Sequence, residues 1–142
     1  MKLSNETIGV LKNFGSVNQN LVIKEGNTLT TMSAMKNIVA KADVGETFPK
    51  EVAIYDLNEF LSSLSLFTQP VLDFQDQYMT MKDEGSKATL KYWYSDPSVV
   101  TSPSKMITMP SEDVKLTLSS EDIEKLKRAA SVVQAPDMVL EK

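Results

Sequence analysis

The sequence contains no cysteine and no histidine among its 142 residues. The absence of cysteine excludes disulfides, thiolate-bound zinc, iron–sulfur clusters and a cysteine nucleophile. The absence of histidine excludes a histidine-based catalytic triad, an imidazole general base and a histidine-bound zinc helix. Several common routes to hydrolytic, redox and zinc chemistry are therefore closed to this chain.

The chain also has almost no arginine and no long hydrophobic run. Its net charge is −4, and every cation except Arg128 is a lysine, which argues against a protein that binds nucleic acid simply through a basic surface. The longest segment without a charged residue, 60–72, is too short and too rich in serine to span a bilayer. No apolar signal segment follows Met1, so we expect a cytoplasmic protein without membrane contact.

Three segments have the spacing of apolar residues that is typical of amphipathic helices. These helices are predicted over residues 5–16, 57–66 and 119–134. Ser4 and Asp56 stand where the N-cap residues of the first two helices are expected. The first two helices are therefore expected to bury one face, whereas the third would expose Ile123, Leu126, Ala130 and Val133 without the rest of its sheet.

Most of the other residues up to position 94 have the alternation of short strands. Strands are predicted at 20–24, 28–32, 37–44, 51–55, 71–75, 77–82 and 87–94. The first two are expected to form a hairpin around Glu25-Gly26-Asn27. Because short turns join most strands and only two helices interrupt them, the sequence predicts an α+β fold, with an antiparallel sheet and helices packed on one face.

Residues 95–113 differ in composition from the segments on either side. They contain three of the six prolines and five serines, which is typical of an extended connector. We therefore predict a first domain at 1–94, a connector at 95–113 and the beginning of a second domain at 114–142, in the order strand, helix, strand.

An internal repeat supports this division. Nine of seventeen positions are identical between residues 3–19 and 118–134. Two unrelated capped helices could share leucine and serine at such spacing, but the strand residues beside each helix also match. The repeat indicates a second copy of the domain that starts near Val114, of which the chain contains about a quarter.

The polar residues suggest little catalytic chemistry. No histidine can activate a serine or threonine, and the five glycines do not form a phosphate-binding loop. Paired carboxylates occur at Asp73/Asp76, Asp83/Glu84 and Glu112/Asp113. We expect solvated turn residues there rather than ligands of a hard metal ion. The chain is therefore expected to have no catalytic residue, no metal, no cofactor and no enzymatic activity.

The outer faces of two predicted helices carry cations. Lys12 and Asn13 lie on the polar side of the first helix, and the repeat places Lys127 and Arg128 at the equivalent positions of the third. Such a face could contact a phosphate backbone without sequence preference. An ordinary solvated helix surface is the other interpretation, and the sequence leaves both open.

Three segments of the chain stand out together: Met1-Lys2-Leu3-Ser4 with Leu11-Lys12-Asn13-Phe14, the block 52–58 with Phe60-Leu61 and Leu64-Ser65-Leu66, and Asp96-Pro97-Ser98 with Pro103, Lys105, Ile107 and Pro110. These segments resemble the DNA polymerase processivity clamps, or sliding clamps, of T-even-type bacteriophages. The middle block is the most specific, and the likeness continues through the third helix. The intervening strands diverge more.

The resemblance implies a DNA-clamp fold and a processivity factor that tethers the replicative polymerase to duplex DNA. In that family three two-domain subunits form a ring, with helices around the central hole and sheets outside. A ring held by topology needs only weak, sequence-independent phosphate contacts, which fits a slightly acidic chain. The residues that we expect to face DNA are Lys12, Asn13, Lys125, Lys127 and Arg128.

The resemblance also implies partners and a location. Besides duplex DNA, the expected partners are the replicative DNA polymerase, the clamp loader and phage late-transcription factors, in the cytoplasm of the infected bacterial host. In clamps generally, such partners dock peptides in an apolar pocket near the connector. The candidates for that pocket are Val99, Val100, Met106, Ile107 and Met109. The same residues could instead serve only to hold the connector against its domain.

The sequence departs from the family pattern in one respect. A family subunit has two complete domains, whereas this sequence contains the first domain and the beginning of the second. Closure of a homotrimeric ring through the second domain is therefore in doubt for this chain. The alternative function is that of a protein-interaction module, which binds partner peptides without encircling DNA.

Overall fold

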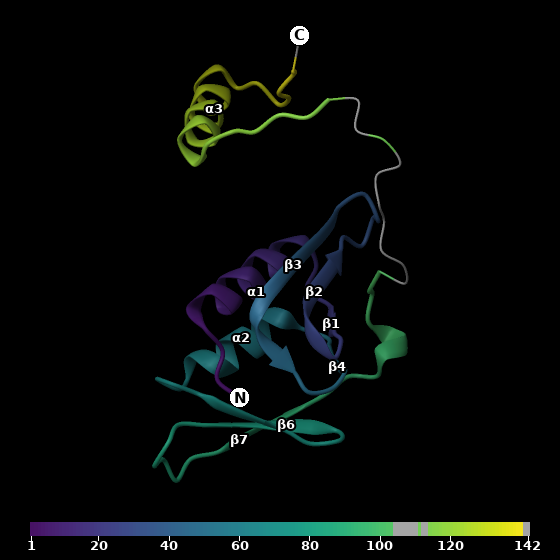
Figure 1. Ribbon diagram of the computed structural model, residues 1–142, viewed down its shortest axis with the longest axis vertical. Helices are drawn as coiled ribbons and strands as arrows, with labels where there is room; N and C mark the ends of the chain where they lie inside the picture. Colours follow the sequence, from purple (N-terminus) through teal and green to yellow (C-terminus); the bar gives the residue numbers. More distant parts are fainter. Residues whose placement is uncertain (104–110, 112–113, 141–142) are drawn as a thin grey trace. The chain divides into compact units, whose positions relative to one another are not determined.

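The computed structural model describes residues 1–103, 111 and 114–140. The chain divides into two compact units, Met1–Ile107 and Thr108–Lys142, and each is described by itself (Figure 1). Three of the connector candidates, Met106, Ile107 and Met109, lie outside the described residues, as do Glu112 and Asp113.

The first unit contains two helices and seven strands among its described residues. In chain order they are α1 (Asn5–Val17), β1 (Leu21–Ile23), β2 (Gly26–Met32), β3 (Val39–Phe48), β4 (Val52–Ile54), α2 (Leu57–Ser65), β5 (Val71–Phe74), β6 (Tyr78–Lys82) and β7 (Leu90–Trp93), followed by the 3-10 turn η1 (Pro97–Val99). All strand pairs are antiparallel. The α+β class predicted from the sequence is confirmed.

The strands pair differently from the prediction. β1 pairs with β4 and β2 pairs with β3, while β5, β6 and β7 form a three-stranded sheet in that order. The predicted hairpin between the first two strands is therefore wrong. All three residues of β1 and of β4 are buried, whereas β2 and β3 alternate between buried and more exposed positions. Because β1 and β4 are both buried on both faces, they suit one another as partners in the interior of the fold.

Both helices of the first unit begin at the predicted cap residues. The Ser4 hydroxyl accepts a hydrogen bond from the Thr7 N–H at 3.2 Å, and the Asp56 carboxylate accepts from the N–H groups of Asn58 and Glu59 at 2.9 and 3.1 Å. These bonds satisfy amides that a helix leaves without a partner at its N-terminus. α1 packs against α2, β2 and β3, so the helix pair covers part of the strands (Figure 1).

One cluster of buried side chains joins the helices to the strands. It includes Leu11 from α1, Leu57 from α2 and Met81 from β6, none of which has any exposed surface. Phe60 of α2 meets the Tyr92 ring of β7 edge-on, with the ring centroids 5.3 Å apart. Burial, with help from the nearby carboxylates of Glu59 and Asp56, raises the pKa of Tyr92 to about 12. Packing of apolar and aromatic side chains thus fixes the helix pair to the three-stranded sheet.

The second unit is built around α3 (Ser120–Val133). Ser119 caps this helix in a reciprocal arrangement with Asp122, which is a capping box. The described residues on either side, 114–119 and 135–140, are not strands, and the strand–helix–strand order stays a prediction. A strand needs a neighbour to bond its backbone, and no described part of this unit supplies one. The boundaries of the predicted domains stay a prediction.

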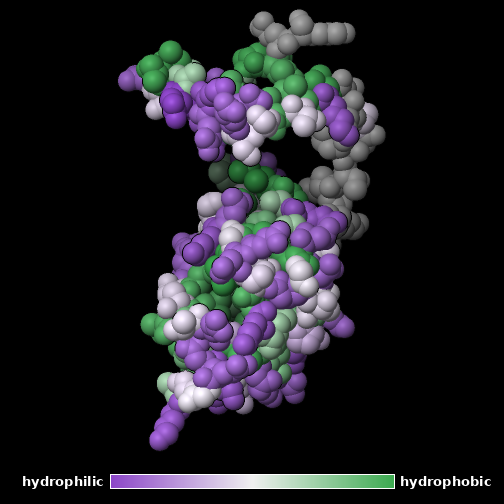
Figure 2. Space-filling view, turned by 60° about the vertical axis from the view of Figure 1, so that its left-hand side comes forward, coloured by the Kyte–Doolittle hydropathy of each residue, from purple (hydrophilic) through white to green (hydrophobic). Residues whose placement is uncertain are grey.

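The apolar side of α3 lies at the surface of the second unit. Ile123 and Leu126 occupy the positions that correspond in the repeat to Ile8 and to the fully buried Leu11, yet both are exposed. Hydrophobic side chains are accordingly visible beside hydrophilic ones on this unit in Figure 2.

Candidate functional site

The outer face of the α1–α2 pair is polar and carries few charges. Lys12 and Asn13 are exposed on α1, as predicted from the spacing of the buried residues. Asn58 and Ser62 are exposed on α2. Lys12 makes no ion pair with any residue that the structure describes. The face thus offers one cation together with amides and hydroxyls, and the exposed carboxylates of Glu6 and Glu59 lie on the same two helices. This composition suits weak contacts with phosphates better than strong binding.

The other predicted cations lie on α3, within the second unit. Lys125 forms an ion pair with Glu121 one turn earlier, with its Nζ 2.7 Å from the carboxylate. Lys127 and Arg128 are exposed. Lys125 is therefore the least available of the three for an external anion, although an exposed pair of this kind is weak.

The beginning of the connector is anchored locally by the segment Asp96-Pro97-Ser98. The Asp96 carboxylate accepts a hydrogen bond from the Ser98 N–H at 2.8 Å and so caps η1. This bond lowers the pKa of Asp96. Proline at the first position of the turn has no N–H that would need a partner. Asp96-Pro97-Ser98, the first of the connector residues that resemble the phage clamps, therefore belong to an N-capped turn.

The two described connector valines lie in opposite environments. Val99 is 58% exposed, whereas Val100 is 7% exposed and forms a small buried cluster with Val22 of β1 and Ala53 of β4. Both line an open cavity of about 340 Å³ between the end of β2 and the connector. Its lining consists of Met32, Lys36, Ser98, Val99, Val100, Thr101 and Ser102. Val100 thus anchors the connector, and Val99 is the apolar side chain that remains accessible.

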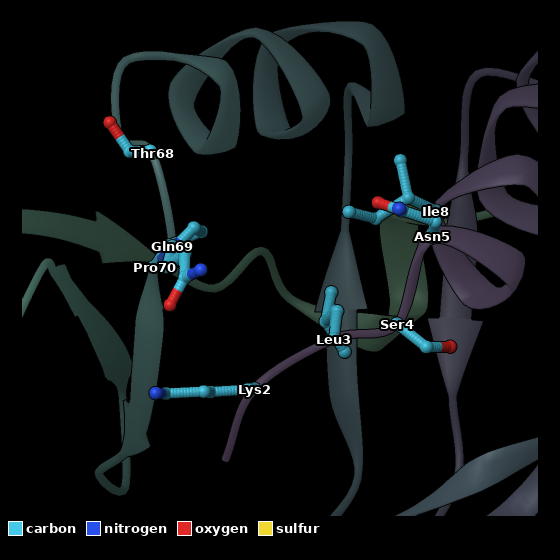
Figure 3. A pocket seen from close by; sticks show the side chains of 8 residues that line it. All are labelled: Lys2, Leu3, Ser4, Asn5, Ile8, Thr68, Gln69 and Pro70. Carbon is cyan, nitrogen blue, oxygen red and sulfur yellow. The ribbon is translucent and has the colours of Figure 1, made fainter.

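A second cavity, of 470 Å³, lies at the other end of the helix pair (Figure 3). It is lined by Lys2, Leu3, Ser4, Asn5, Ile8, Thr68, Gln69 and Pro70. In Figure 3 the Lys2 side chain extends toward the segment of Gln69 and Pro70, whereas the Ser4 side chain points away from it. Lys2, its one charged lining residue, is paired with Glu84 at 3.1 Å. Sequence reasoning missed this cavity because it joins segments about sixty residues apart.

The paired carboxylates have structural partners. Asp76 accepts a hydrogen bond from Lys50 at 2.8 Å, and this bond with the positive charge of the lysine lowers the pKa of Asp76. Asp83 accepts from the N–H groups of Thr68 and Gln69 at 3.0 and 2.8 Å. Among the described residues no three acidic side chains cluster as metal ligands would. These carboxylates hold turns together.

No helix in the part of the chain that the structure describes has both the length and the apolar character needed to cross a bilayer.

The fold and these surfaces define a class of protein: an α+β domain with a polar helix face and a docked connector, whose described residues present surfaces rather than a catalytic constellation. Comparison with known proteins makes the class specific. The profile of a family described as DNA polymerase processivity factor matches residues 4–109. The chain therefore belongs to the DNA polymerase processivity factor family.

Three curated relatives carry the name sliding clamp. The protein of Vibrio phage KVP40 is 34% identical over 97% of this chain and 63% of its own length. Those of Enterobacteria phage T4 and Escherichia phage RB69 are 32% and 31% identical, each over 94% of this chain and 59% of the relative. The chain thus spans about three fifths of the length of the relatives that it matches. The resemblance to phage sliding clamps is confirmed.

Proposed function

We propose that this chain acts in a sliding clamp, a ring that encircles duplex DNA and tethers the replicative DNA polymerase. The observation that carries the proposal is the alignment of 97% of the chain with a phage protein named sliding clamp. In this function the chain performs no catalytic step. Its work is topological, and its place of action is the cytoplasm of an infected bacterium.

The polar helix faces supply the contacts with DNA in this proposal. Lys12 and Asn13 on α1, with Lys127 and Arg128 on α3, would meet phosphates without reading bases. Lys125 is a weaker candidate because it is paired with Glu121. Few cations on an acidic chain favour sliding, since each phosphate contact is screened by salt and none is specific for sequence.

The connector region supplies the docking surface for proteins. The polymerase, the clamp loader and late-transcription factors would bind near Val99, beside the cavity at the end of β2. Met106, Ile107 and Met109 remain candidates from the sequence. The ring itself would be a homotrimer of full-length subunits.

The proposal is tested with a polymerase and clamp loader from the same source. Primed DNA is supplied either as a closed circle or as a linear molecule with free ends, and product length is measured. A ring held by topology lengthens the products on the circle and loses this effect on the linear template. Equal stimulation on both templates contradicts tethering by encirclement. Full-length KVP40 sliding clamp with its own polymerase is the positive control.

A protein-interaction module that never encircles DNA is the second candidate. It is favoured by one observation, the accessible Val99 at the rim of the connector cavity. A module of this kind binds the polymerase but leaves product length unchanged on either template. The same experiment, with polymerase binding measured alongside, therefore separates the two functions.

A further inference from the structure

Two asparagines in the turn between α1 and β1 bond to the connector from a distance of more than eighty residues in sequence. They are Asn18 and Asn20, which we call the asparagine pair. Asn18 is the C-cap residue of α1. Neither residue belongs to a helix or strand. No sequence pattern marked either of them as a candidate functional residue.

The Asn18 side chain joins three segments. Its Nδ2 donates to the carbonyl oxygen of Met32, at the end of β2, at 2.7 Å, and also to the carbonyl oxygen of Thr101 at 3.4 Å. Its Oδ1 accepts from the N–H of Asn20 at 2.9 Å. One amide therefore bonds to a strand end, to the connector and to the second asparagine.

The Asn20 side chain bonds to the backbone N–H of Thr101, the residue whose carbonyl oxygen is bonded to Asn18. Its Oδ1 accepts from the Thr101 N–H at 3.3 Å, and its Nδ2 donates to the carbonyl oxygen of Tyr55 at 2.6 Å. Thr101 thus has both its backbone N–H and its carbonyl oxygen bonded to side-chain amides. The two bonds to Thr101 are at the long end of the hydrogen-bond range, so each is modest alone.

Neighbouring contacts make the position of Thr101 specific. Val100 is buried against Val22 and Ala53, and the Ser95 N–H donates to the Ala53 carbonyl oxygen at 2.9 Å. The connector is therefore attached to β4 at Ser95, packed at Val100 and hydrogen-bonded at Thr101. Because Met32, Val99 and Thr101 all line the connector cavity, the asparagine pair bonds to two of its walls.

We propose that Asn18 and Asn20 are positioning residues: they hold the connector against the end of β2 and so set the shape of the cavity in which a partner's peptide docks. This inference deepens the proposed function and rests on it for the identity of the partner. The side-chain amides form the hydrogen bonds to the Thr101 backbone that a neighbouring strand would otherwise form. The connector is ordered at Thr101 before any partner binds, so the partner does not bear the cost of ordering it.

The first test measures hydrogen exchange of the Thr101 amide in the 142-residue chain by NMR. Loss of one neutral hydrogen bond of about 1 kcal/mol corresponds to roughly fivefold faster exchange, and we expect at least that acceleration in Asn20→Ala. Asn20→Asp keeps an acceptor oxygen for the Thr101 N–H but loses the bond donated to the Tyr55 carbonyl oxygen, so we expect it to retain more protection than Asn20→Ala and less than the unmodified chain. Asn27→Ala, at an exposed asparagine of β2, is the matched control. Equal exchange rates for Thr101 in Asn20→Ala and Asn27→Ala overturn the inference.

The second test measures the affinity of each variant for the replicative polymerase without DNA, at a temperature where circular dichroism finds all variants folded. A positioning role predicts about fivefold weaker binding by Asn20→Ala, and partial rescue by Asn20→Asp, which keeps only the acceptor for Thr101. A merely structural role leaves the affinity unchanged once the chain is folded, and that result overturns the inference. Should Asn20→Ala not fold, Asn18→Asp, which removes both donated bonds, replaces it in both tests.

The two proposals fail in different ways. If the unmodified chain does not bind the polymerase, the proposed function is contradicted whatever Thr101 does. If the chain binds the polymerase but the Thr101 amide exchanges at the same rate in the asparagine variants as in the unmodified chain, only the positioning role is contradicted.

Discussion

Glu46 on β3 accepts a hydrogen bond from the hydroxyl of Thr7, a fully buried residue in the first turn of α1. A second bond comes from the backbone N–H of Ser4, the cap residue. Burial opposes the charged form of Glu46, but these bonds more than offset it and lower its pKa below the usual 4.5. A carboxylate on a strand thus attaches the start of the proposed DNA-facing helix to the sheet.

We predict that Glu46→Gln lowers the free energy of unfolding by about 1 kcal/mol at pH 7, since it replaces a charged acceptor with a neutral one. The pKa of Glu46 is lower in the folded chain, so its contribution is present above pH 4.5 and is lost as pH falls through the folded value. Urea unfolding at pH 7 and pH 3 measures this. The difference between wild type and Glu46→Gln should shrink at pH 3, and Thr7→Val should behave in the same way. An equal difference at both pH values would show that the charge of Glu46 is irrelevant.

The two glycines of α1 are predicted to respond differently to alanine. A Cβ at Gly9 meets nothing within 4 Å, whereas one at Gly15 lies 3.4 Å from Asn58 Oδ1 on α2. Gly9→Ala should therefore raise the free energy of unfolding by roughly 0.5–1 kcal/mol, the usual gain inside a helix.

Gly15→Ala should gain less, because the new methyl group crowds α2. Removing the crowding atom with Asn58→Ala in the same chain should restore the gain. Thermal unfolding of the single and double variants measures both effects. Identical shifts for Gly9→Ala and Gly15→Ala would mean that α1 and α2 are not in close contact at this point.

The connector valines form a second matched pair. Val100→Ala should cost about 1–2 kcal/mol, because it removes buried methyl groups from the cluster with Val22 and Ala53. Val99→Ala should change stability by less than about 0.5 kcal/mol, since Val99 is largely exposed, and should instead weaken polymerase binding. Chemical denaturation and a binding assay measure the two properties. A Val99 variant that loses stability but keeps its affinity would contradict the proposed docking surface.

Charge reversal tests the polar helix face. Lys12→Glu should shorten the time that the clamp is retained on circular DNA, and more so together with Lys127→Glu and Arg128→Glu, because phosphate contacts are lost and repulsion is added. The effect should fade as salt is raised. Lys41→Glu, an exposed lysine of β3, is the control for net charge. Retention that falls equally in the Lys12 and Lys41 variants would point to total charge rather than to this face.

Local signals in the sequence were sufficient to predict where α1 and α2 begin and which of their faces is buried. Ser4 and Asp56 cap α1 and α2 as expected, and the buried residues Leu11, Phe14 and Phe60 follow the predicted stripes. Capping and helical periodicity involve residues within a few positions of one another, so no distant part of the chain is needed to interpret them. For the same reason the exposure of Lys12 and Asn13 was predictable.

Local sequence signals could not predict the strand pairing or the contacts of the connector. β1 pairs with β4 rather than β2, and Asn18 and Asn20 meet Thr101, because burial on both faces and the packing of Val100 bring distant segments together. The sequence by itself determined the α+β class, the helix caps, the polar helix faces and the lack of histidine and cysteine chemistry. Only the tertiary structure decided which strands are neighbours, which carboxylates hold turns and how the connector is held. Those choices depend on contacts between residues far apart in the chain, for which no local pattern exists.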